Sequence, residues 1–329
     1  MGGDHGPAEI VAGALRSALA RPDIEILLVG SPERLGQLLP SPVPANLRTV
    51  AAEQVVEMSE HPAKALREKP ESSIAVAARL VRDGEAQAFL SAGNTGASMA
   101  AALLHLGRIR GIARPAIAIT TPTPSGPVVL LDAGANADTK PEYMEQFGIM
   151  GASYAACLYA IDKPKVGLLN IGEEKTKGSQ LYQASYELLS SNRSLHFIGN
   201  IEGRDFLGGK ADVVVADGFV GNVVLKVMEG LSEMLFAELK TIAAGSLIAR
   251  IGGALLSPSL KDLKAKLDHE EYGGAQLLGV QGGCFIAHGG SRAKAIANAI
   301  DVASRMVRTG VVEAIAARVS EGGAVSSDD

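Results

Sequence analysis

The sequence has 329 residues, of which 47% are hydrophobic but only 4% aromatic, and it contains no Trp. This length is enough for one large α/β domain or two smaller ones, with a core built mainly from Ala, Val, Ile and Leu. The net charge of −5 argues against a general nucleic-acid-binding protein, which is usually basic.

The two cysteines, Cys157 and Cys284, form neither a CxxC motif nor a pair with metal-ligand spacing, which favours a reduced, cytoplasmic setting. The sequence contains no run of about eighteen uncharged apolar residues, so it does not predict a transmembrane helix. The first residues, "MGGDHGP", lack the basic and apolar parts of a signal peptide. We expect a single domain over residues 1–320 and a disordered acidic tail over 321–329.

Short apolar runs alternate with longer helical patterns along most of the chain. The predicted strands cover residues 24–30, 86–93, 116–120, 127–134, 165–172 and 211–218, and the helical patterns include 142–160 and 222–244. Most of the strands are continuously apolar, as expected for strands that are covered on both faces. The sequence therefore predicts an α/β fold with a largely parallel sheet, helices on both faces and right-handed crossovers.

Glycine-rich polar segments follow four of these strands: "SAGNTGA", "DAGANADTK", "NIGEEKTKG" and "DGFVGN". In open parallel sheets, ligands bind at the carboxyl ends of strands, where free N–H groups favour anions. The candidate ligand-binding residues are Gly93, Asn94, Thr95, Asn136, Asp138, Lys140, Gly178 and Gly221. Such turns are also ordinary features of α/β proteins, and Asp138 could simply cap a helix that begins near Pro141. No Walker loop or clean GxGxxG motif points to a nucleotide.

Lys177, between Thr176 and Gly178, could hold an anion after the strand that ends near residue 172, or it could lie in a solvated turn. Asn222 directly precedes "VVLKVM" and could be a helix N-cap, a neutral hydrogen-bond donor in a site, or both. We expect no metal, because the sequence shows no suitable cluster of carboxylates.

The segment 242–272 predicts a helical hairpin. We expect "GGALLSP" to break the helix and to display Leu255 and Leu256, and the helix that follows to carry Lys261 and Lys264 on a basic face. The hairpin could pack on its own domain or on a second subunit. Alternatively, it could protrude as a basic amphipathic element that contacts a membrane or an acidic partner.

The motifs "MGGDHGP", "SAGNTGA", "LDAGANADTKPE", "NIGEEKTKG", "GNIEGRD", "DGFVGN" and "YGGAQLLGVQGGCFIAHG" occur in this order. Over essentially the whole chain they resemble the PlsX-type phosphate acyltransferases of bacterial phospholipid synthesis. The resemblance implies transfer of an acyl group from acyl carrier protein to inorganic phosphate, without a cofactor. It also implies a fold similar to phosphotransacetylases and isocitrate-type dehydrogenases, and a homodimer that attaches reversibly to the cytoplasmic membrane surface. A downstream glycerol-3-phosphate acyltransferase is a possible further partner.

The implied chemistry needs no Ser–His–Asp set, because phosphate is itself the nucleophile. By resemblance, Lys177 and Asn222 occupy positions that the family uses in catalysis: the ammonium would neutralise phosphate and the amide would donate a hydrogen bond. Because the carrier protein is acidic, Arg250 and the basic helix with Lys261 and Lys264 form a plausible docking site. In one departure, the family places a short strand ending in Asp-Ala before "MGGD", so we expect the neighbours of that strand to be unpaired.

Three other functions remain open at this point. The first is a short-chain phosphotransacylase that uses CoA thioesters, against which the lipid-like hairpin argues. The second is an NAD-dependent decarboxylating dehydrogenase on a related fold, although the sequence shows no evident arginine cluster or metal-binding aspartates for it. The third is a non-catalytic scaffold that recruits enzymes of lipid synthesis to the membrane.

Overall fold

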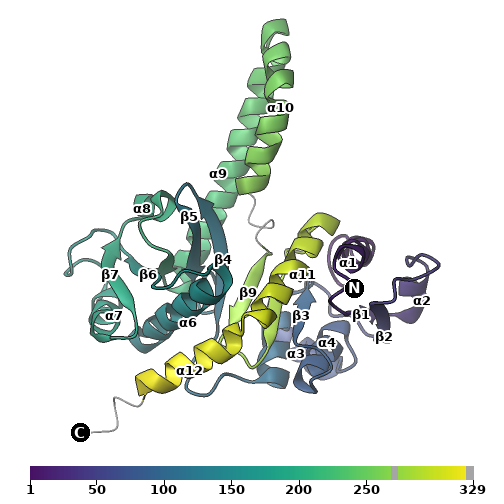
Figure 1. Cartoon of the computed structure of the whole chain (residues 1–329), viewed down its shortest axis with the longest axis horizontal. Helices are drawn as coiled ribbons and strands as arrows, with labels where there is room; N and C mark the ends of the chain where they lie inside the picture. Colours follow the sequence, from purple (N-terminus) through teal and green to yellow (C-terminus); the bar gives the residue numbers. More distant parts are fainter. Residues whose placement is uncertain (268–272, 324–329) are drawn as a thin grey trace.

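The chain forms an α/β structure, shown as a computed structural model in Figure 1, which describes residues 1–267 and 273–323. The strands are β1 (Ile26–Gly30), β2 (Leu47–Ala51), β3 (Ala88–Ser91), β4 (Ala116–Thr123), β5 (Gly126–Leu131), β6 (Lys165–Leu169), β7 (His196–Ile201), β8 (Val213–Val215), β9 (Ala275–Leu278) and β10 (Gly283–Ile286). The helices are α1 (Ala8–Ala20), α2 (Pro32–Gly36), α3 (Pro62–Glu68), α4 (Ser73–Arg82), α5 (Thr95–Ala101), the π-helical turn η1 (Ala102–Leu106), α6 (Pro141–Tyr159), α7 (Gln180–Ser191), α8 (Gly203–Gly208), α9 (Gly218–Ala244), α10 (Leu247–Leu267), α11 (Ala293–Arg308) and α12 (Val311–Gly323).

Eight strands form the main sheet in the order β3-β10-β9-β4-β5-β8-β6-β7, and β1 and β2 form a separate parallel pair. Four neighbouring pairs in the main sheet are parallel and three are antiparallel. The predicted α/β class and largely parallel sheet are therefore confirmed. The antiparallel exceptions are β9 and the hairpin of β4 and β5, which turns at Pro124 and Ser125.

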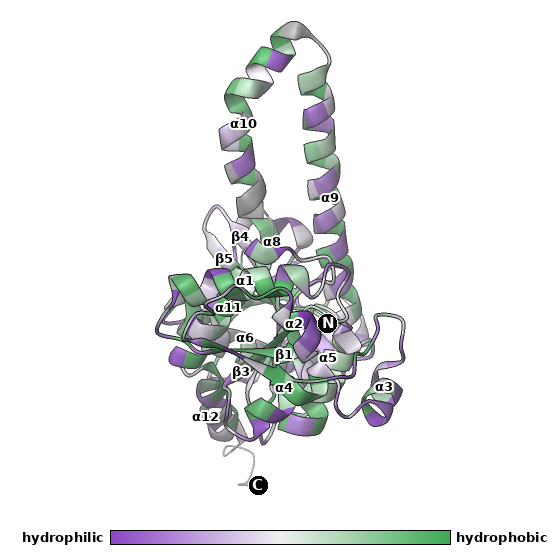
Figure 2. Cartoon of the chain, turned by 90° about the vertical axis from the view of Figure 1, so that its right-hand side faces the viewer, coloured by the Kyte–Doolittle hydropathy of each residue, from purple (hydrophilic) through white to green (hydrophobic). Residues whose placement is uncertain are grey.

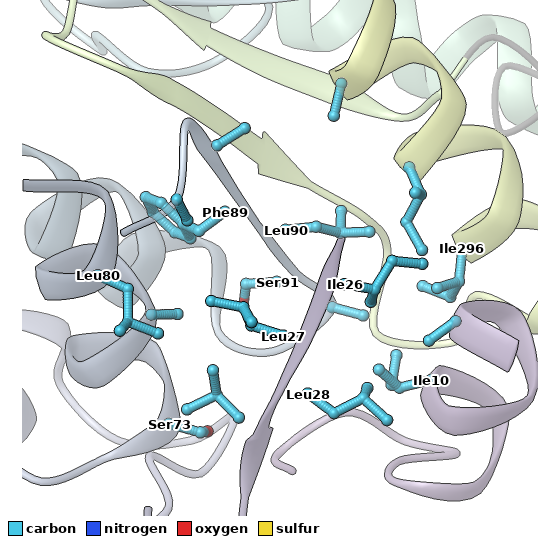
Figure 3. A pocket seen from close by; sticks show the side chains of 18 of the residues that line it. Ile10, Ile26, Leu27, Leu28, Ser73, Leu80, Phe89, Leu90, Ser91 and Ile296 are labelled. Atoms are coloured by element: carbon cyan, nitrogen blue, oxygen red, sulfur yellow. The ribbon is translucent and has the colours of Figure 1, made fainter. Parts of the chain in front are cut away.

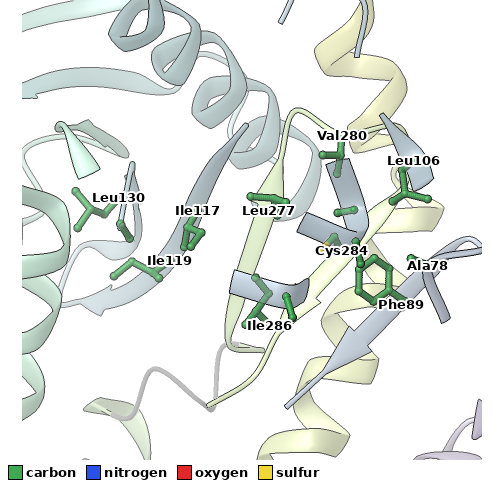
Figure 4. Packing of buried hydrophobic residues seen from close by; sticks show 14 of the residues in the cluster. Ala78, Phe89, Leu106, Ile117, Ile119, Leu130, Leu277, Val280, Cys284 and Ile286 are labelled. Carbon is green, nitrogen blue, oxygen red and sulfur yellow. The ribbon is translucent and has the colours of Figure 1, made fainter. Parts of the chain in front are cut away.

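Helices cover both faces of the main sheet, as the continuously apolar strands predict. On β4, Ile117 and Ile119 face a core that includes α4 and α5, whereas Ala116 and Ala118 face a second core under α6 and α12. Figure 4 shows part of the first core, in which side chains from β3, β4, β5, β9 and β10 pack together. This alternation requires apolar residues at every position of a strand, because each side chain meets a helix layer.

The strands β1 and β3 face each other across a cavity of about 440 Å³ (Figure 3). Leu27 and Leu28 of β1, Phe89 and Leu90 of β3, and Ile296 of α11 contribute to its apolar lining. In the described chain no strand lies between β1 and β3, and β3 is the outermost strand of the main sheet. β3 therefore has a strand partner on one side only among the described residues.

The helices α9 and α10 form a long antiparallel hairpin that projects from the body (Figures 1 and 2). The predicted break at "GGALLSP" is wrong, since α10 runs through this segment and contains Pro258; the chain turns instead at Gly245 and Ser246. Near the turn α10 approaches α9 closely: a Cβ built on Gly253 would lie 2.8 Å from the Ala243 Cβ, so the glycine there permits this approach. No helix among the described residues is long and apolar enough to cross a membrane.

Several predicted boundaries change in the structure. The helix predicted over 222–244 begins four residues earlier, at Gly218, whereas the helix predicted over 142–160 agrees with α6. The strands β2, β7, β9 and β10 were not predicted, because their apolar runs are short or broken by glycine. Helix α12 extends to Gly323, so residues 321–323 are helical rather than disordered. The rest of the predicted tail, 324–329, and residues 268–272 of the predicted hairpin lie outside the described residues.

Candidate active site

The directions of the strands decide which of the glycine-rich segments come together. Strands β5, β8, β6 and β7 run in the same direction, so the segments 132–140, 217–222 and 170–178 all lie at one end of the sheet. Strand β3 runs in the opposite direction, because three antiparallel pairings separate it from β5. The expected convergence therefore holds for three segments, and the segment that contains Gly93, Asn94 and Thr95 lies at the other end of the sheet.

Asn94 is the N-cap of helix α5, and its side chain is committed to the fold. Its Oδ1 accepts a hydrogen bond from the backbone N–H of Ala97 at 2.9 Å, which caps the helix. Its Nδ2 donates to the backbone carbonyls of Glu57, Met58 and Glu60. With 7% of its surface exposed and its side-chain amide used in these bonds, Asn94 has no side-chain donor left for a ligand, which argues against its assignment as a phosphate contact.

The buried carboxylate of Asp132, at the end of β5, organises the segment that follows. Its Oδ1 accepts from the backbone N–H groups of Ile117, Gly134 and Ala135 at 2.9, 3.1 and 2.9 Å. Its Oδ2 accepts from the backbone N–H of Asn136 at 2.8 Å and from the Asn136 side-chain Nδ2 at 2.9 Å. These amide groups thus already hold an internal anion and are not free for phosphate. Burial raises the pKa of the Asp132 carboxyl, although the hydrogen bonds act in the opposite direction.

The N-terminus of helix α9 is capped by Asp217 and not by Asn222, which corrects the N-cap alternative for Asn222. The Asp217 Oδ1 accepts from the backbone N–H groups of Phe219 and Val220, each at 3.0 Å. Its Oδ2 accepts from the hydroxyl of Tyr182 on α7 at 2.6 Å. Burial and this carboxylate raise the pKa of the Tyr182 hydroxyl, so the hydroxyl remains a donor at neutral pH.

Asn222 lies in the second turn of α9 and packs against the segment held by Asp132. A Cβ atom built on Gly134 would lie 3.4 Å from the Asn222 Oδ1, and a Cβ on Gly221 would overlap the carbonyl oxygen of Asp132. Gly221 is therefore required for close packing and does not present an open backbone to a ligand. The Asn222 amide, which no hydrogen bond of the described residues occupies, remains available at the surface of this junction.

Lys177 lies on a well-supported loop and not in a loose turn. The Asn170 Nδ2 donates to the Lys177 carbonyl at 3.2 Å, and the Gln183 Nε2 donates to the carbonyl of Gly178 at 3.1 Å. Gly178 has a φ of 88°, and a Cβ there would lie 2.6 Å from the Asn170 Oδ1, so this position requires glycine. The loop is thus a fixed platform for the Lys177 side chain.

Two charged side chains in the same loop as Lys177 have ionic partners, whereas Lys177 has none in the part of the chain that the structure describes. Lys175 pairs with Glu187 at 2.9 Å, and Glu173 pairs with Lys210 at 2.5 Å. The exposed Lys177 ammonium has no ion pair among residues 1–267 and 273–323. An unpaired ammonium on a rigid loop is suited to an anionic ligand.

Asp138 and Lys140 are exposed at the same end of the sheet, in the segment that leads to α6. The residue at the N-cap position of α6 is Lys140, and it makes no side-chain capping bond, so Asp138 does not cap this helix. Asn136 is not free, because its Nδ2 donates to Asp132 and to the Pro115 carbonyl. Within the described chain, no group of three or more His, Cys, Asp or Glu side chains could hold a metal ion.

The structure places Lys177 and Asn222 at the ends of the adjacent parallel strands β6 and β8. A chain of contacts connects the two regions through Tyr182. A Cβ built on Gly178 would lie 2.8 Å from the Tyr182 Cβ, and the Tyr182 hydroxyl donates to Asp217 at the start of α9. The cavity beside β1 is lined by neither residue. Sequence reasoning missed Asp132, Tyr182 and Asp217; the two aspartates carry a usable signal, since each directly follows an apolar strand.

A family model with the description "Fatty acid synthesis protein" matches residues 1–314 of the chain. The phosphate acyltransferase of Desulfitobacterium hafniense strain Y51 is 55% identical over 317 residues, which cover 96% of this chain and 94% of that protein. The chain belongs to the phosphate acyltransferase family. The phosphate acyltransferase of Trichodesmium erythraeum is 47% identical over 325 residues, covering 96% of this chain and 93% of that relative.

Solved structures agree with the predicted fold of this phosphate acyltransferase. A phosphotransacetylase from Streptococcus pyogenes matches with a TM-score of 0.60 at 15% identity, covering 94% of this chain and 92% of that one. The EutD phosphotransacetylase from Staphylococcus aureus matches with a TM-score of 0.53 at 14% identity, covering 90% and 98%. At this level of identity the match shows a shared fold alone.

Proposed function

We propose that this phosphate acyltransferase moves a long-chain acyl group from acyl carrier protein to inorganic phosphate and so supplies acyl phosphate for phospholipid synthesis. A phosphate oxygen attacks the thioester carbonyl carbon, the carbon–sulfur bond breaks, and the carrier thiolate leaves and takes up a proton. The observation that carries this proposal is the unpaired Lys177 ammonium, on a supported loop at the same end of the sheet as Asn222, in a chain of this family.

The two residues have different roles in this proposal. Lys177 balances the charge of the phosphate and holds it against the carbonyl carbon, and such positioning lowers the barrier by up to about 7–11 kcal/mol. Asn222 donates from its amide to the carbonyl oxygen, where negative charge develops, and one such donor contributes about 3–4 kcal/mol. Lys140 and Gly178, from the same end of the sheet, complete the surroundings of the phosphate. No covalent intermediate on the protein is needed.

The test measures phosphate-dependent loss of a long-chain acyl carrier protein thioester, with the acyl phosphate trapped by hydroxylamine. We expect Lys177→Ala and Asn222→Ala each to lower kcat by about 10²–10³-fold. Lys175→Ala is the matched control, because Lys175 lies in the same loop but pairs with Glu187, and it should retain activity. A wild-type protein that forms no acyl phosphate, or a Lys177→Ala protein as active as the control, would contradict the proposal.

A second candidate is transfer from short-chain acyl-CoA, which the fold shared with two phosphotransacetylases favours. Acetyl-CoA and a long-chain acyl carrier protein distinguish the two candidates when they are compared at equal concentration. We expect kcat/KM to be higher for the carrier-protein substrate. The opposite order would assign the chain to short-chain chemistry.

We further propose that the hairpin of α9 and α10 attaches the enzyme reversibly to the cytoplasmic membrane surface, where a glycerol-3-phosphate acyltransferase can take up the product. Large apolar side chains are exposed near the turn, including Ile248 (85%), Leu255 (78%) and Leu256 (58%). Each buried leucine contributes about 1.5–3 kcal/mol, which supports reversible attachment. Leu255→Glu with Leu256→Glu should release the protein from anionic vesicles and leave activity on soluble substrate unchanged; undiminished vesicle binding would contradict this.

The same hairpin supports two further interactions. Exposed apolar residues recur along α9, including Val223, Val227 and Leu231, and a second copy of the chain would cover them in a homodimer. Arg250 and Lys261 are exposed on α10 and offer a basic face to the acidic carrier protein, while the side chain of Lys264 lies outside what the structure describes. Sedimentation of Val227→Glu with Leu231→Glu tests the dimer, and a monomeric variant is expected.

A further inference from the structure

Asp132 has the most extensive hydrogen bonding around the candidate site, yet its carboxylate is completely buried and so contacts no substrate. Five donors converge on its two oxygens, all within 3.1 Å. They come from Ile117 at the start of β4 and from the segment 134–136. A carboxylate is the appropriate group, because it only accepts hydrogen bonds and all five neighbours donate.

The same residue also fixes the position of helix α9. The Asp132 backbone N–H donates to the Ala216 carbonyl at 2.9 Å, which joins the ends of β5 and β8. A Cβ on Gly218 would lie 2.7 Å from the Asp132 Oδ2, so the first turn of α9 rests directly on the carboxylate. Gly134, whose N–H is held by Asp132, is the residue against which Asn222 packs.

We propose that Asp132 is a positioning residue for acyl transfer: its ionised carboxylate holds the segment 133–136 in the one shape that places the Asn222 amide toward the reacting carbonyl. This inference rests on the proposed function of the same site. Asp132 acts through Gly134 and Asn222 and touches neither phosphate nor the acyl group. A displacement of a catalytic group by about 1 Å from its optimal position can lower the rate by about 10²-fold.

The direct test is Asp132→Asn, which keeps the shape but replaces one acceptor oxygen with an NH₂ that faces N–H donors. We expect kcat to fall by about 10²-fold, with the KM for phosphate unchanged. Asp212→Asn is the matched control: its carboxylate also accepts a backbone N–H, from Lys165 at 2.7 Å, but at the opposite end of β8. This control should keep its kcat.

A double-mutant cycle separates positioning from a general loss of stability. If Asp132 acts through Asn222, Asp132→Asn in the Asn222→Ala background should cause little further loss in kcat. Multiplicative losses in the double variant would overturn the inference. So would an Asp132→Asn protein with wild-type kcat while the wild type is active. Absence of activity in the wild type would instead contradict the proposed function.

A milder variant covers the case in which Asp132→Asn does not fold. Asn136→Ala removes one donor from the Asp132 Oδ2 and leaves the carboxylate in place. We expect a smaller fall in kcat, about 10-fold, with an unchanged KM for phosphate. A higher KM for phosphate with unchanged kcat would show that Asn136 binds phosphate directly, and would overturn the supporting role assigned to it here.

Discussion

At the scale of single residues, the candidate site separates side chains that face solvent from side chains that build the framework. Lys177 and Asn222 keep their polar groups available, whereas the side chains of Asn94 and Asp132 and the Nδ2 of Asn136 are taken up by hydrogen bonds within the chain. All of these residues look equally polar in the sequence. Their roles differ because buried polar groups must find partners inside the protein.

Gly221 provides a residue-scale prediction. In Gly221→Ala the new Cβ would overlap the Asp132 carbonyl oxygen, and a backbone atom cannot move aside easily. We expect the free energy of unfolding to fall by about 3 kcal/mol. Gly230→Ala on the same helix is the control: nothing lies within 4 Å of the new Cβ, so it should add about 1 kcal/mol of stability. Chemical denaturation measures both, and equal effects would contradict the prediction.

At the scale of elements, the first turn of α9 connects helix α9 to helix α7 and to the loop of Lys177. Asp217 caps the helix and accepts from Tyr182 on α7, so α9 and the loop of Lys177 are held at one junction. The hairpin shows the reverse case, in which helix α10 continues through the glycine and proline signals in "GGALLSP". Local sequence signals are reliable where a side chain satisfies a helix end, and less so where tertiary packing supplies the energy.

Asp217 provides the element-scale prediction. Asp217→Ala removes the cap of α9 and leaves the Tyr182 hydroxyl without its acceptor, so the free energy of unfolding should fall by about 2 kcal/mol. Asp217→Asn keeps an acceptor oxygen for the helix end and should lose less. Thermal unfolding followed by circular dichroism compares the two. An alanine variant as stable as the asparagine variant would show that the cap contributes little.

At the scale of the whole molecule, ion pairs join segments that are far apart in the sequence. Arg21 and Asp23, between α1 and β1, pair with Asp301 and Arg308 of α11. The neighbouring Arg21 guanidinium holds the pKa of the Asp23 carboxyl well below its usual range. These pairs connect the separate β1–β2 sheet to the helix that packs on the main sheet.

The depressed pKa of Asp23 determines the sign of a pH effect. The folded protein favours the ionised form, so the contribution of Asp23 is present above its ordinary pKa of about 3.9 and is lost as the pH falls through the lower folded value. Asp23→Asn should therefore lower Tm by a small amount at pH 7, and the difference should disappear in the acid range. High salt should also reduce it, because the pairs are exposed. A difference in Tm that is as large at pH 2 as at pH 7 would contradict this account.

The sequence by itself determined the α/β class, most strands of the main sheet and the family, because apolar runs and glycine-rich motifs are local patterns. It also located Lys177 and Asn222, whose roles in catalysis stay predictions. Only the tertiary structure decided that β3 runs opposite to β5, which moves Asn94 to the other end of the sheet. It alone showed that Asp132 occupies the amides of the segment after β5. Strand direction and the choice of hydrogen-bond partners depend on contacts between distant segments, and no local pattern records them.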